Sequence, residues 1–109
     1  MPLAILISQV ELLEAELSSH QGNNDEAKAH YFASVGSARE SGFIHEQGLA
    51  CELAGIHCRN TGDNSSARNF FDQAKLCYTE WGSQIKVDSI TRQLDSLQCQ
   101  STGIKQPIK

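Results

Sequence analysis

Proline is almost absent from this chain of 109 residues, which contains only Pro2 and Pro107, one near each end. Strict alternation of apolar and polar residues is also lacking over any useful length. Internal proline would interrupt long helices, and alternation with a period of two is typical of half-buried strands. The chain is therefore expected to form helices, separated by short turns that are rich in Gly, Asn, Asp and Ser.

Long hydrophobic runs and clustered basic residues are missing as well. The longest apolar stretch, residues 2–7, is much shorter than the roughly 20 residues of a membrane-spanning helix, and no basic residues precede it as in a secretory signal. The net charge is −4, and the nine Lys and Arg residues are scattered. Because nucleic acids and anionic membranes attract clustered cations, neither is expected as a partner.

Cysteine occurs four times, but without the spacing of a metal motif or a disulfide framework. Cys51, Cys58 and Cys77 fall within helical patterns, and Cys99 follows them. Cys51, His57 and Cys58 share one predicted helix, yet a closed zinc site requires four converging ligands. Reduced thiols in a cytoplasmic protein are the simpler interpretation. We therefore expect no bound metal, no cofactor and no disulfide, with a small metal protein as an alternative.

The most informative feature that the chain does contain is a pattern repeated after 40 residues. Each copy has a turn glycine, then an alanine, an aromatic residue and a small residue at helical spacing. The two sets are Gly22, Ala27, Tyr31 and Ser34, and Gly62, Ala67, Phe71 and Ala74. A repeat of this length indicates stacked supersecondary units, and here the units would be helical hairpins.

Apolar residues at spacings of three and four predict five helices. Their ranges are Leu6–His20, Asp25–Ser41, Ile44–Asn60, Ser65–Trp81 and Ile85–Leu97. The apolar stripes expected on them are Leu6, Val10, Leu13 and Leu17; Ala27, Tyr31, Val35 and Ala38; Leu49, Leu53 and Ile56, with Ala50, Ala54 and Cys58 beside them; Ala67, Phe70, Phe71, Ala74, Cys77, Tyr78 and Trp81; and Val87, Ile90, Leu94 and Leu97.

The turns and ends of these helices add further expectations. Asn24 or Asp25 would cap the second helix, and Gly48 and Gly55 would mark places where a neighbouring helix crosses close to the backbone. Short turns make consecutive helices antiparallel neighbours, which gives two hairpins and a closing helix. Residues 1–97 are expected to be the helical domain, and residues 98–109 a disordered tail.

The repeated pattern resembles the second-helix signature of tetratricopeptide repeats. The small residue of the first helix falls at Ala15 and at Gly55, seven positions before each turn glycine. The period of 40 residues is longer than the usual 34, and the aromatic residue of the first helix is missing in both copies. The resemblance implies an all-α, right-handed α-solenoid fragment built of antiparallel, tetratricopeptide-like hairpins.

A closer resemblance covers residues 11–95. It is carried by Phe43, His45, Glu46, Leu49, Ala50, Glu52, Leu53, Ala54, Gly62, Ala67, Arg68, Ala74, Cys77, Tyr78, Trp81, Gly82, Lys86 and Val87. These residues resemble the tetratricopeptide-like segment of large sensor histidine kinases, which also contain a serine/threonine-kinase-like domain, an AAA-type ATPase and GAF domains. The resemblance implies a non-catalytic role in signal transduction, as a protein-interaction or interdomain scaffold, because none of the catalytic domains is matched.

The first helices of stacked hairpins line a concave surface, which is the usual binding face of such repeats. Candidate partner-binding residues on these helices, outside the apolar stripes, are Glu11, Glu14, Gln47, Glu52 and Arg59. Their net acidity favours a basic or mixed-charge peptide, or another domain of a parent signalling protein. The apolar residues Leu3, Ile5, Leu6 and Ile7 also favour self-association through the N-terminal end, or an exposed apolar patch there.

Two other functions are compatible with a helical chain. A sensor segment of a helical-repeat transcriptional regulator would require an adjoining basic helix-turn-helix, which this chain lacks. A small helical enzyme would require a polar pocket with perturbed titrating groups. The four histidines lack an acid–base arrangement in the sequence, and we expect no catalytic residue.

Overall fold

The computed structural model describes the backbone of residues 3–102 and the side chains of residues 9–97. Every regular element in that part of the chain is a helix: α1 (Leu3–His20), α2 (Asn24–Ser41), α3 (Ile44–Asn60), α4 (Asn64–Trp81) and α5 (Gln84–Thr102). The expected all-α class and the number of helices are confirmed for the described residues.

The ends of the helices differ from the expected ones at a few points. α1 begins at Leu3, three positions before Leu6, and α5 continues to Thr102. Residues 98–102, which were expected in the tail, therefore belong to α5, and residues 103–109 lie outside the described residues. The N-cap of α2 is Asn23 in place of the expected Asn24 or Asp25, and its side chain makes no capping hydrogen bond.

A glycine lies at or just after the end of each of the first four helices. Gly22, Gly42, Gly62 and Gly82 have φ angles of 83°, 77°, 88° and 92°. Left-handed backbone of this kind is strained for residues that carry a Cβ, so glycine is the residue that stops a helix there at little cost. The chain thus reverses direction about once every 20 positions, and two reversals make up the 40-residue period.

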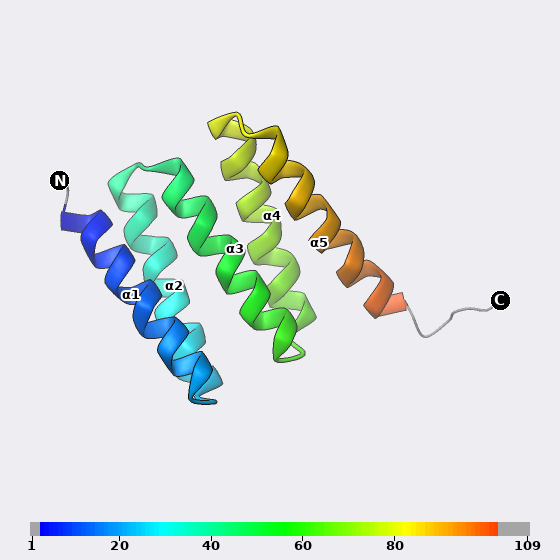
Figure 1. The fold of residues 1–109 in the computed structure, drawn as a ribbon, viewed down its shortest axis with the longest axis horizontal. Coiled ribbons are helices and arrows are strands. Elements are labelled where there is room, and N and C mark those ends of the chain that lie inside the picture. Colours follow the sequence, from blue (N-terminus) through cyan, green and yellow to red (C-terminus); the bar gives the residue numbers. More distant parts are fainter. Residues whose placement is uncertain (1–2, 103–109) are drawn as a thin grey trace.

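The helices lie side by side in chain order and alternate in direction (Figure 1). α1 packs on α2 and α3 packs on α4, while α2 meets α3 and α4 meets α5. The molecule is a thin plate with principal extents of 54 × 34 × 16 Å. Because neighbours in sequence are also neighbours in space, each inner helix is covered on two sides and open on others.

The apolar stripe expected on α2 is confirmed, since Ala27, Tyr31, Val35 and Ala38 are all buried. On α5, Ile90 and Leu97 are fully buried, and Val87 and Leu94 are partly buried. These helices pack through the residues that the periodicity singled out.

The stripes expected on α1 and α3 are wrong in their orientation. The side of α3 that packs on its neighbours carries the small residues Ala50, Ala54 and Cys58. Leu49 is 37% exposed, and Leu53 and Ile56 are only partly buried. Two neighbouring helices approach α3 closely enough to require small residues, so its larger leucines lie on a third, open side.

On α1 the residue that packs on α2 is Ala15, which is fully buried. Val10, Leu13 and Leu17 are 51%, 71% and 53% exposed, in contrast to the expected core stripe. They form an exposed apolar patch along α1, and the patch expected at the N-terminal end rests on other residues. The side chains of Leu3, Ile5, Leu6 and Ile7 lie outside the described residues.

The aromatic residues of α4 point in different directions. Phe71 lies against α3, next to Gly55. Phe70 lies against α2, where its ring is 5.0 Å from the ring of Phe32. Both are buried, as expected, but Trp81 is 53% exposed. It lies at the last position of α4, and its indole stacks on His45.

Gly48 and Gly55 mark the expected close approach between α3 and α4. A Cβ added to Gly55 would lie 2.7 Å from Cε1 of Phe71, and one added to Gly48 would lie 2.9 Å from Cε1 of Tyr78. Two aromatic side chains of α4 thus rest directly on the backbone of α3. This contact explains why two glycines occur inside a helix despite their low helix propensity.

Asp63 connects the two hairpins at the start of α4. Its Oδ1 accepts a hydrogen bond from the backbone N–H of Ser66 at 3.2 Å, which caps the helix. Its Oδ2 accepts a hydrogen bond from Nζ of Lys28 on α2 at 2.8 Å. The hydrogen bonds from Lys28 and Ser66 lower the pKa of Asp63 to about 2.

The Asp63→Ala variant should lower the free energy of unfolding by about 0.5–2 kcal/mol at neutral pH, because it removes a helix cap. The folded-state pKa is below the value of about 3.9 expected for an unfolded chain. The stabilisation is therefore fully present above about pH 4 and is lost as the pH falls towards 2. Urea denaturation of both proteins between pH 7 and pH 2.5 measures the difference, with Asp72→Ala, an exposed carboxylate of the same helix, as control. A difference that does not change with pH would contradict this role.

Candidate functional site

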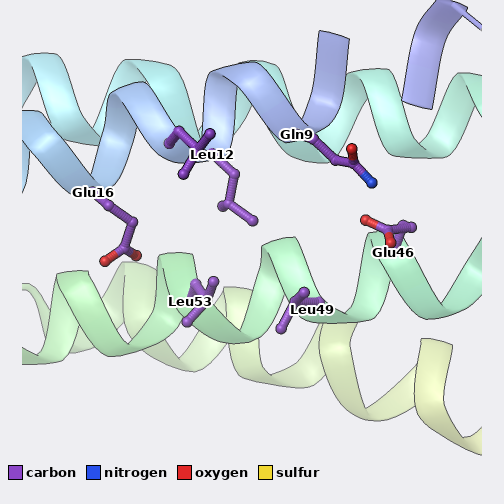
Figure 2. A pocket seen from close by; sticks show the side chains of 7 residues that line it. Gln9, Leu12, Glu16, Glu46, Leu49 and Leu53 are labelled. Atoms are coloured by element: carbon purple, nitrogen blue, oxygen red, sulfur yellow. The ribbon is translucent and has the colours of Figure 1, made fainter. Parts of the chain in front are cut away.

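A groove of about 390 Å³ lies between α1 and α3, the first helices of the two hairpins. It is lined by Gln9, Leu12, Leu13, Glu16, Glu46, Leu49 and Leu53. Figure 2 shows the side chains from the two helices facing one another across the opening. The groove exists because α1 and α3 are each packed on α2 and meet one another only at one edge. Its volume is within the range of ligand-binding clefts.

The apolar part of the groove consists of leucines that are not fully buried. Leu12 and Leu53 are partly buried, and Leu13 and Leu49 are exposed. They project from α1 and α3 on the side that neither α2 nor α4 covers. Water reaches these side chains in the groove, so burying them under a partner would be favourable.

Glu16 is held in place at one end of the groove. One of its carboxylate oxygens accepts a hydrogen bond from the phenol of Tyr31 at 2.6 Å. Burial, together with the Glu16 carboxylate, raises the pKa of the Tyr31 phenol, so Tyr31 remains a hydrogen-bond donor at physiological pH. The other lone pairs of Glu16 face the opening, where they can accept a hydrogen bond or attract a cation.

Glu46 lies towards the other end of the groove, on the first turn of α3. Its carboxylate is 3.8 Å from Nε2 of His45. The His45 ring stacks on Trp81, with 5.2 Å between the ring centroids, and also stacks on Phe43. The groove is therefore an apolar channel with a carboxylate towards each end and an aromatic cluster near one of them.

The five partner-binding candidates from the sequence lie outside the residues that line this groove. Glu11 accepts a hydrogen bond from Nδ1 of His30 at 2.6 Å, which raises the pKa of His30. Glu14 is exposed, and Gln47 is half-buried.

Glu52 and Arg59 are engaged within the fold. Glu52 accepts a hydrogen bond from the phenol of Tyr78 at 2.8 Å and pairs with Lys86 at 3.3 Å, and only 13% of its side chain is exposed. Arg59 donates a hydrogen bond to Gln93 on α5. Charge reversal at Glu52 should therefore destabilise the protein, because it would break contacts among three helices.

The residues that the sequence pattern missed are Leu12, Leu13, Leu49, Leu53, Glu16 and Glu46, together with Gln9. Leu13, Leu49 and Leu53 were assigned to apolar stripes and Leu12 to none, and apolar periodicity is the same for a core face as for an exposed groove. One available signal was the set of small residues beside Leu49 and Leu53. Alanine and glycine favour close contact between helices, so they indicate the packed side of α3 and leave the leucines on another side.

The cysteines and His57 of α3 lie apart from any group of metal ligands in the described residues. No group of three or more His, Cys, Asp or Glu side chains in this part of the chain is arranged to hold a metal ion. Burial raises the pKa of the Cys51 thiol to about 12 and also raises that of Cys58. His57 is engaged by Ser19 and the backbone carbonyl of Asn24.

No helix among the described residues is both long and apolar enough to cross a bilayer. Comparisons with protein-family models, curated proteins and solved structures find no significant match to this chain.

Proposed function

We propose that this chain is a non-catalytic protein-interaction module, a tetratricopeptide-like helical repeat that binds a segment of another protein, or of a parent signalling protein, in the groove between α1 and α3. The observation that carries the proposal is the groove itself, with exposed leucines along its length and a carboxylate towards each end. The resemblance to the repeat segment of sensor kinases agrees with such a role in signal transduction.

The lining of the groove specifies the chemistry of the segment that it would bind. Leu12, Leu13, Leu49 and Leu53 favour leucine, isoleucine or other apolar side chains. Glu16 and Glu46 favour lysine or arginine on either side of the apolar residues of the peptide. The net charge of −4 adds a general attraction for cations. The expected ligand is a short peptide in which apolar residues are flanked by basic ones.

This proposal can be tested by selecting peptides that bind the chain from a randomised library displayed on phage. Enriched peptides should combine apolar and basic residues, and their binding should weaken as the salt concentration rises. The Leu49→Ser variant should weaken binding of the selected peptides about threefold or more, because full burial of a leucine contributes about 1.5–3 kcal/mol and a partner would bury the 37% of Leu49 that is exposed.

Ile85→Ser is the matched control, since Ile85 is 81% exposed on α5 and does not line the groove. This variant should leave peptide binding unchanged. Failure to enrich any peptide, or enriched peptides that bind the Leu49→Ser variant as well as the parent chain, would contradict the proposal.

A further inference from the structure

α1 has a second apolar surface beside the groove, which we name the end face. It consists of Val10, Glu14 and Leu17, which follow one another at spacings of four and three along one side of the helix. Val10 and Leu17 are each more than half exposed, and Glu14 is exposed between them. No helix in the described part of the chain covers the end face.

The 40-residue repeat provides counterparts of the end face within the same molecule. Adding 40 and then 80 to each residue number gives Ala50, Ala54 and His57 on α3, and Ile90, Leu94 and Leu97 on α5. All of these counterparts are buried except Leu94, which is partly buried. The same positions are thus covered on two helices and uncovered on α1.

The cover on α3 is the second helix of the preceding hairpin. The ring of Tyr31 on α2 is 5.2 Å from the ring of His57. His57 also lies 3.0 Å from the hydroxyl of Ser19 and 3.3 Å from the carbonyl oxygen of Asn24, at the turn that leads into α2. On α5 the preceding helix is α4. The element that fits the end face is therefore an antiparallel helix that takes the place of α2 or α4.

Glu14 gives the end face a charge that its counterparts lack, because Ala54 and Leu94 occupy the equivalent positions. A helix that covered Glu14 would bury a carboxylate, which requires a cationic partner. A second copy of this chain that paired through its own α1 would not supply one, since residues 1–27 contain no Lys or Arg. A symmetric antiparallel pair that placed Val10 against the other copy's Leu17 would also bring the two Glu14 carboxylates together.

We propose that the end face of α1 is a docking site for an amphipathic helix of another protein, antiparallel to α1, with Lys or Arg in the centre of its apolar side. Val10 and Leu17 pack on the apolar residues of that helix, and Glu14 pairs with the cation between them. The end face and the groove adjoin at Leu13 but share no residue, so this proposal does not depend on the proposed function of the groove.

A synthetic peptide derived from α2 is a suitable probe. Tyr31 lies at the level of His57, the counterpart of Leu17. Val35 is one turn further along α2 and, because α2 and α3 are antiparallel, falls near the level of Ala54, the counterpart of Glu14. The probe is residues 24–41 with V35K, held helical by a crosslink through exposed positions because short helices are marginal in water. The peptide without V35K is its control.

Fluorescence anisotropy with the labelled probe and the full chain should show saturable binding that is at least tenfold tighter for the V35K peptide than for its control. Glu14→Gln and Leu17→Ser should each weaken binding of the V35K peptide at least tenfold. Leu76→Ser, at an exposed position of α4, and Leu49→Ser, in the groove, should leave it unchanged.

Three results would overturn the proposal. The first is no saturable binding of the V35K peptide, and the second is equal binding to the parent chain and to Leu17→Ser. The third is a dimer of the parent chain, detected by sedimentation equilibrium, that Leu17→Ser dissociates, because a second copy would then be the occupant. The substituted residues are exposed, so circular dichroism should show that the variants fold like the parent chain.

Discussion

Replacing Phe71 with alanine should lower the free energy of unfolding by about 3–5 kcal/mol, the largest effect expected of any single substitution considered for this chain. Phe71 is completely buried, and its ring lies on the backbone of α3 at Gly55. Removing the ring loses the free energy gained by burying it. It also leaves a cavity next to Gly55, which has no side chain that could move to fill it. Urea denaturation measures the loss.

A small domain with a total stability of about 5–15 kcal/mol can be largely unfolded by such a change. Phe71→Leu keeps part of the buried volume and should give a smaller loss that remains measurable if Phe71→Ala does not fold. Leu76→Ala, at a position that is 69% exposed, should change the stability by about 0.5 kcal/mol or less. A loss of less than about 1 kcal/mol for Phe71→Ala would show that Phe71 is not a core residue.

The same chemical change, glycine to alanine, should have opposite effects at two helical positions. Gly55→Ala would place a Cβ 2.7 Å from Cε1 of Phe71, so it should destabilise the protein by about 1–3 kcal/mol through overpacking. At Gly36, in α2, the Cβ added by Gly36→Ala would have no atom within 4 Å beyond its chain neighbours and the adjacent helix backbone. This variant should stabilise the protein by about 0.5–1 kcal/mol, because alanine favours the helix.

Thermal or chemical denaturation of the two variants provides the comparison. If both variants shift the stability in the same direction, the close approach of α3 and α4 at Gly55 is not as described. The double variant Gly55→Ala with Phe71→Leu tests the cause more directly. Its loss should be smaller than the sum of the two single losses, because a smaller side chain at position 71 makes room for the added methyl group.

The helices and turns of this protein could be predicted from the sequence because their signals are local. Turn glycines and helical periodicity gave the number of helices and most of their ends. The buried faces of α2 and α5 also followed, since Tyr31 and Ile90 lie in stripes with one clear apolar side. Gly55 was correctly interpreted as a close crossing, because glycine inside a helix requires a reason in its packing.

The groove could not be predicted in the same way. α1 and α3 are apolar on more than one side, and periodicity alone does not tell which side meets a neighbouring helix. On α3 the close neighbours select alanine and glycine for the core, so Leu49 is left in the groove. The role of Glu52 depends on Tyr78 and Lys86, residues from two later helices, and such a contact is visible only once the chain is folded.

The packing of each helix mainly on its neighbours in chain order affects how the protein can form during synthesis. The contacts between α1 and α2 do not require α3, and each later helix adds to a surface that its predecessors can already form. Contacts between residues close in sequence require little loop closure, so the search for the native arrangement is short. Apart from the apolar side chains of α1 and of the groove, which stay exposed in the folded protein, the growing chain therefore presents mainly its most recent helix to aggregation.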